Sequence, residues 1–132
     1  MAWLIRLLAI GIAVLAIGPA YIEIASWLAM RRELAADPSL TVRWDVAAIS
    51  LALHGTLALL GAYAAIGLSR LRRSGWWASI AFLVASILYV AVFSWTSVLG
   101  EPHPQGASAV ILVHAVPLIV LSLPACRRAC ES

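Results

Sequence analysis

The sequence predicts an all-α integral membrane protein, a bundle of four transmembrane helices with its N and C termini on the cytoplasmic side. Three observations predict it: an apolar composition, four long apolar runs, and arginines and tryptophans at the ends of those runs. The 132 residues are 64% hydrophobic and 11% charged, with a mean hydropathy of +0.99. A soluble domain carries about 25% charged residues. Composition therefore excludes a soluble enzyme, a disordered chain and a nucleic-acid-binding domain.

The four apolar runs cover residues 7–30, 44–69, 76–99 and 107–123. A helical span needs about 20 apolar residues, and the last run is close to the lower limit of about 17. None of the runs alternates apolar and polar residues with period two, which argues against a membrane β-barrel. An apolar segment in lipid must satisfy its own backbone hydrogen bonds, so each run is expected to be a helix. No linker is long enough to separate domains, and we expect a single domain.

Three polar links separate the runs, and each contains residues that end helices. The first contains Asp37-Pro38, the second is the basic turn Arg70 to Gly75, and the third runs from Gly100 to Gly106 with two prolines. Proline removes a backbone donor and restricts the residue before it. Glu101 and His103 in the third link are too few to form a metal site by themselves. We expect a solvated turn there and no bound metal.

Arginine placement predicts the orientation of the spans. All nine basic residues are arginine, and the chain has no lysine or asparagine, which is typical of a GC-rich bacterial genome. With four spans, the side that holds the termini carries six arginines against one acidic residue, and the opposite side carries three against four. Basic residues favour the cytoplasmic side, which predicts cytoplasmic termini in a bacterial inner membrane. All six tryptophans lie near a run end, at the headgroup level that tryptophan prefers.

The first run also resembles a secretory signal peptide, with Arg6, an apolar stretch and the small residues of Gly18-Pro19-Ala20. Because the apolar character continues to Met30, we favour a retained span. Small residues recur at helical spacing along the first three runs, as at Ala9 and Ala16. They predict close helix packing, either within one chain, in a homodimer or against a partner membrane subunit.

Glu23, His54 and His114 are the acidic and basic side chains that lie well inside the runs, away from their ends. An ionisable group in hydrocarbon costs at least a few kcal/mol, so each needs a reason to be there. Counting 1.5 Å per residue from the outer end of each span places all three roughly 10–15 Å deep. A carboxylate and an imidazole at one depth form a pair suited to acid–base chemistry. We expect these three residues to form the catalytic or binding centre of an outward-facing cavity.

Tyr89 falls in the same layer and is expected to donate its hydroxyl to a ligand, with Trp27 and Trp95 as further ligand-binding residues. The predicted function is the binding or handling of a lipophilic small molecule, in contact with membrane lipid. Whether the protein is an enzyme is left open, and no cofactor is expected.

Three alternatives stay open at this point. The first is a non-catalytic membrane subunit or assembly partner, whose polar residues serve packing alone. The second is haem b held between His54 and His114, since two imidazoles on facing helices are an axial ligand pair. The third is a small proton-coupled exporter that uses Glu23, although no motif of such exporters is present. Cys126 and Cys130, four residues apart on the basic tail, are expected to be free thiols.

Overall fold

The computed structural model describes residues 1–95 and 106–131, and all regular elements in these two ranges are α-helices. They are α1 (Ala2–Ala36), α2 (Trp44–Ser69), α3 (Arg73–Trp95), α4 (Ala107–Ser122) and α5 (Pro124–Glu131). The predicted run 44–69 coincides with α2. The part of the predicted third span beyond residue 95, and the predicted turn with Glu101 and His103, lie outside the described residues.

Helix α1 is longer than the apolar run that predicted it. It continues through Arg31 and Arg32 and ends at Ala36, where the amide of Asp37 donates to the carbonyl of Glu33. The apolar run ends at Met30 because charged residues follow it, whereas the helix persists until Asp37-Pro38 interrupts it. Pro19 lies inside α1, and the helix is continuous through it.

The α1, α2 and α3 helices are long and apolar enough to cross a membrane. The α4 helix, of 16 residues, counts as a fourth crossing when it is taken together with α5, which bends away from it by 65°. Leu123 and Pro124 form the break, and proline suits the first position of the new helix because that position has no intrahelical acceptor for its amide. The prediction of an all-helical chain with several apolar, span-length helices is confirmed.

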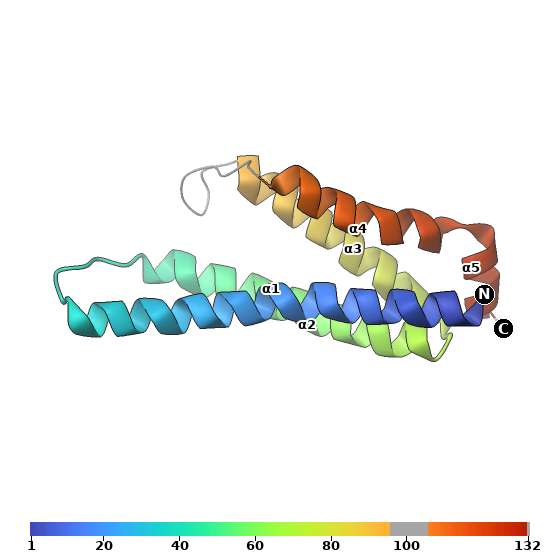
Figure 1. The fold of residues 1–132 in the computed structure, drawn as a ribbon, viewed down its shortest axis with the longest axis horizontal. Coiled ribbons are helices and arrows are strands. Elements are labelled where there is room, and N and C mark those ends of the chain that lie inside the picture. Colours follow the sequence, from blue (N-terminus) through green and yellow to red (C-terminus); the bar gives the residue numbers. More distant parts are fainter. Residues whose placement is uncertain (96–105, 132) are drawn as a thin grey trace.

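The tail after α4 is a short amphipathic helix. Cys126 and Cys130, one helical turn apart, are buried, while Arg127 and Arg128 between them are exposed. Both cysteines are free thiols. Arg127 pairs with Glu131 at 2.8 Å, and its guanidinium lies 5.9 Å from the ring of Trp76 on α3. The α5 helix therefore closes the end of the bundle at which both termini lie (Figure 1).

The helices pack as two hairpins joined side by side. Each helix packs on the next in the chain, α1 on α2, α2 on α3 and α3 on α4, whereas α1 and α4 have at most slight contact among the described residues. Figure 1 shows the α3–α4 hairpin diverging from the α1–α2 hairpin with distance from the termini. The core lies at the terminal end, where its buried members include Ile5, Ile12, Leu68, Phe82 and Leu121.

Small residues permit the close packing at this terminal end. Gly67 of α2 and Gly75 of α3 meet backbone to backbone, and a Cβ added at Gly75 would overlap the Gly67 backbone. Farther along, a Cβ added at Gly61 would overlap that of Ala16 on α1 and touch the Phe82 ring at 3.0 Å. These contacts fix the distance between α1, α2 and α3 just below the point where the two hairpins separate.

Candidate functional site

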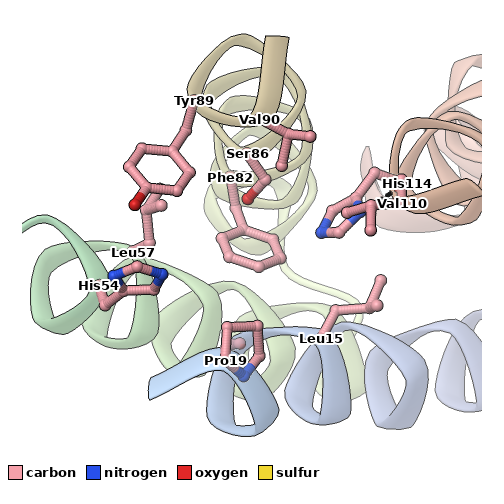
Figure 2. Close-up of a pocket in the computed structure, with 11 residues that line it drawn as sticks. Leu15, Pro19, His54, Leu57, Phe82, Ser86, Tyr89, Val90, Val110 and His114 are labelled. Atoms are coloured by element: carbon pink, nitrogen blue, oxygen red, sulfur yellow. Dashed lines mark hydrogen bonds between the residues drawn. The ribbon is translucent and has the colours of Figure 1, made fainter. Parts of the chain in front are cut away.

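Where the hairpins diverge, residues of four helices surround a cavity of about 230 Å³, here called the site pocket. Its walls are mainly apolar, and its polar side chains are His54 of α2, Ser86 and Tyr89 of α3, and His114 of α4 (Figure 2). The other lining residues are Leu15, Ala16, Pro19, Leu57, Phe82, Val90 and Val110. The two histidines and the tyrosine predicted from the sequence thus border one cavity.

His54 connects the site pocket to Glu23. Its Nδ1 lies 2.9 Å from the carbonyl oxygen of Ser50, one helical turn earlier, and 3.8 Å from Oε2 of Glu23 on α1. The side chains of His54 and Glu23 are 16% and 24% exposed, so the pair is mostly shielded inside the protein. A carbonyl only accepts hydrogen bonds, so Nδ1 carries a hydrogen and Nε2 is the nitrogen left for the pocket.

Glu23 itself does not line the site pocket. It borders a separate hollow between α1 and the start of α2, together with Met30, Val42, Arg43 and Ser50. The structure therefore places Glu23 and His54 in contact but on two adjoining hollows, with His54 between the carboxylate and the site pocket.

Tyr89 lies next to His54, with ring centroids 5.1 Å apart in an edge-to-face arrangement. Its hydroxyl also lies near the side chain of Ser50, the residue whose carbonyl holds His54. In Figure 2 the Tyr89 hydroxyl points toward His54. Ser50, His54, Tyr89 and Glu23 thus form one polar cluster at the divergent end of the molecule.

His114 enters the site pocket from the opposite side. Its Nδ1 lies 2.8 Å from the carbonyl oxygen of Val110, one turn earlier on α4, and the residue is 5% exposed. Figure 2 shows a ring nitrogen of His114 facing the space beside Ser86 and Phe82. Counting residues from the span ends predicted that His54 and His114 lie at a similar depth. The structure adds that both side chains turn toward the same cavity.

Ser86 is a site residue that the sequence analysis missed. It is 6% exposed and lines the pocket, and its hydroxyl has no hydrogen-bond partner within the described residues. Serines in apolar helices usually donate to a carbonyl one turn earlier, as Ser79 on the same helix does to Gly75 at 2.7 Å. One serine among several gives no sequence signal for its direction, so burial and bonding in the fold are needed to identify it.

The two predicted tryptophans do not border the site pocket. Trp27 lies on α1 beyond Glu23, where the guanidinium of Arg31 is 5.0 Å from its ring centroid. Trp95 ends α3 and is 52% exposed. The structure does not bring either tryptophan to His54, Tyr89 or His114.

The arrangement does not suit haem between His54 and His114. Figure 2 shows the Phe82 ring between the two imidazoles, and that ring is fully buried, with its centroid 6.3 Å from that of His114. The cavity of about 230 Å³ lies below the roughly 300–1,000 Å³ of sites for drug-sized ligands, so it has room for a molecule smaller than those and not for a porphyrin. Among the described residues, no group of three or more His, Cys, Asp or Glu side chains is arranged to bind a metal ion.

Comparison of the chain with protein-family models, with curated proteins and with solved structures gives no match. The geometry of the site pocket and of the Glu23–His54 pair is therefore the basis for assigning a function.

Proposed function

We propose that this chain is a four-span protein of a bacterial inner membrane that binds a lipophilic small molecule in the site pocket. Three long apolar helices and the bent α4–α5 pair support the number of spans. The excess of arginine on the side of the termini supports cytoplasmic termini. The site pocket then lies within the bilayer and faces its outer half.

The observation that carries this proposal is a mostly apolar cavity that contains polar atoms without partners. Buried polar groups in proteins are hydrogen-bonded in the great majority of cases. Ser79 and Trp76 follow that rule, since their side chains donate to the carbonyls of Gly75 and Leu121. Ser86 departs from it within the described residues, and it does so where the cavity lies.

The competing function is that of a membrane subunit whose polar residues serve packing alone. In such a protein the buried hydroxyls and imidazoles would hold neighbouring helices together. Here the histidines donate from Nδ1 to carbonyls of their own helices, at Ser50 and Val110, and turn their other edge toward the cavity. A ligand site accounts for that orientation, and a packing role does not.

The route for a lipophilic ligand lies between α1 and α4. Leu15 and Pro19 line the pocket from α1, and Val110 and His114 line it from α4, yet the described parts of these two helices have at most slight contact with each other. A molecule dissolved in lipid reaches the pocket from the side without crossing a polar surface. The Glu23–His54 pair lies across the pocket from His114, where it can accept or return a proton through the imidazole.

The proposal is tested by filling the pocket. Val90→Phe adds a ring to the pocket lining, and Val84→Phe adds the same ring at an exposed position of the same helix. Both proteins are purified in mild detergent beside the unmodified chain, and co-purifying molecules are extracted and identified by mass spectrometry. We expect a lipophile bound to the unmodified protein and to Val84→Phe, and lost from Val90→Phe. Identical extracts from all three proteins would contradict the proposal.

A further inference from the structure

The α3–α4 side of the site pocket has two buried polar atoms that face the same space. They are the hydroxyl oxygen of Ser86 and Nε2 of His114, in residues that are 6% and 5% exposed. Within residues 1–95 and 106–131 neither atom has a hydrogen-bond partner, and the two do not bond to each other. Leaving a buried donor or acceptor unpaired is destabilising, so the pair indicates what a ligand must supply.

The hydrogen bond of His114 to its own helix fixes what Nε2 can do. The Val110 carbonyl accepts, so Nδ1 of His114 carries the hydrogen that it donates. A neutral imidazole has one donor and one acceptor nitrogen, which makes Nε2 an acceptor. A charged ring would need a counterion, and no described carboxylate forms an ion pair with His114. The neutral ring is therefore the form that suits this apolar position.

The two atoms have complementary requirements. Nε2 of His114 needs a donor, and the Ser86 hydroxyl, with its own hydrogen free, is able to donate to an oxygen. A single hydroxyl group on a ligand satisfies both, because its hydrogen goes to Nε2 while its oxygen accepts from Ser86. A carbonyl or ether oxygen accepts from Ser86 alone and leaves Nε2 without a donor.

The remainder of the pocket specifies the body of the ligand. The cavity measures about 230 Å³, and a cavity of about 150 Å³ holds one benzene ring. Its walls are the Phe82 ring and aliphatic side chains, including Leu15, Leu57 and Val90. A ring with a short substituent fits this volume, and a longer alkyl tail leaves between α1 and α4 into lipid.

Resting on the proposed function, we infer that the site pocket recognises a phenolic headgroup, bound through its hydroxyl to Ser86 and His114. A carboxylate is a poor fit, because the described arginines lie outside the pocket lining and would leave its charge unpaired. A protonated amine is excluded for the same reason, since Glu23 lies behind His54 rather than in the pocket. The hydroxyl is neutral, and it pairs both orphan atoms.

The test compares ligands that differ by one atom group. Binding of para-propylphenol, its methyl ether para-propylanisole, propylbenzene and hexanol is measured by titration calorimetry with the protein in nanodiscs. The Val90→Phe protein, in the same lipid, gives the background from partition into the bilayer. Ser86→Ala removes the proposed donor, and Ser79→Ala is the matched control, a buried serine on the same helix whose hydroxyl is already bonded to Gly75.

We expect para-propylphenol to bind at least about tenfold more tightly than the ether, the hydrocarbon or hexanol, because the ether leaves Nε2 unpaired and hexanol lacks the ring. Ser86→Ala should weaken phenol binding by about fivefold or more and change ether binding by less than about twofold. Ser79→Ala should change neither. The ¹⁵N resonance of His114 Nε2 should shift with the phenol and stay in place with the ether.

Two failures are distinguishable. If the ether, the hydrocarbon or hexanol binds as tightly as the phenol and Val90→Phe abolishes that binding, the phenolic assignment is overturned and the site pocket remains a ligand site. A second result would contradict both the proposed function and this inference. In that result, no compound binds the unmodified protein above the Val90→Phe background, and extracts of the unmodified protein contain no bound lipophile.

Discussion

A double-mutant cycle on Glu23 and His54 tests whether the polar cluster is a coupled unit. The perturbations are Glu23→Gln, which removes the charge and keeps the shape, and His54→Phe, which keeps a ring beside Tyr89. The Oε2 to Nδ1 distance is 3.8 Å. For a carboxylate and a protonated imidazole at that distance, an effective dielectric constant of 20 gives an attraction of about 4 kcal/mol, and a neutral imidazole leaves only the weaker attraction between a charge and an N–H dipole. Desolvation of both groups offsets a large part of it, and we expect a coupling free energy of about 1–3 kcal/mol.

The assay is reversible unfolding in mixed micelles of mild detergent and sodium dodecyl sulfate, followed by far-ultraviolet circular dichroism. The free energy of unfolding is measured for the unmodified protein, the two single variants and the double variant. Arg43 and Asp45 provide a control cycle, since their 2.7 Å ion pair is shorter but their side chains are 76% and 62% exposed. Solvent screens an exposed pair, so its coupling should be too small to measure.

Because burial matters more than distance here, we expect the coupling free energy of Glu23–His54 to exceed that of Arg43–Asp45. A coupling at Glu23–His54 no larger than that at Arg43–Asp45 would refute the reasoning. It would mean that the carboxylate and the imidazole act independently, and that Glu23 has no influence on the ring that borders the site pocket.

Three further predictions concern the frame of the molecule. Gly75→Ala should lower the free energy of unfolding by at least about 2 kcal/mol, because the new methyl group overlaps the backbone of α2. The control Gly18→Ala, at a position in open space, should be neutral or stabilising by up to about 1 kcal/mol. Equal effects of the two substitutions would contradict the close contact between Gly67 and Gly75. Trp76→Phe should lower the free energy of unfolding by about 1–2 kcal/mol, since the carbonyl of Leu121 at the end of α4 loses its indole donor. An unchanged unfolding curve would mean that this hydrogen bond does not stabilise the fold. Hydrogen bonds from the Ser39 hydroxyl and amide lower the pKa of Asp37 in the folded protein. The ionised Asp37 carboxylate therefore stabilises the fold above about pH 4, and this stabilisation is lost as the pH falls through the lowered pKa of the folded state. A titration followed by the carboxyl ¹³C resonance of Asp37 should show the lowered pKa, and Ser39→Ala should raise that pKa toward the value of a free aspartate.

The helices were predictable to the extent that hydropathy and helix ends coincide. They coincide in α2, where Trp44 and Ser69 bound both the apolar run and the helix. They differ in α1, because Arg31 to Ala36 are polar or small but contain no residue that interrupts a helix. The α5 helix was missed, although Pro124 and the buried pair Cys126 and Cys130 at a spacing of four are typical of a short amphipathic helix.

The site was predictable in depth but not in direction. Counting residues from the span ends placed Glu23, His54, Tyr89 and His114 in one layer, and the last three of these line one pocket. The count does not fix the angle at which each residue leaves its helix, because that angle depends on which helices pack together. The count therefore did not show that Glu23 contacts His54 from an adjoining hollow and not from within the site pocket. It also gave no indication that Ser86 faces the cavity.

The distribution of small and large residues explains why a cavity forms at this level. Below it, Gly61, Gly67 and Gly75 let the backbones of α1, α2 and α3 approach until no further space remains. Above Gly61, the facing positions carry His54 and Tyr89, whose rings hold the hairpins apart. Phe82 lies at the boundary, in contact with Gly61 on one side and with the cavity on the other. A side chain larger than hydrogen at Gly61 would therefore push the Phe82 ring into the pocket, so the volume available to a ligand is set by the same contact that closes the core.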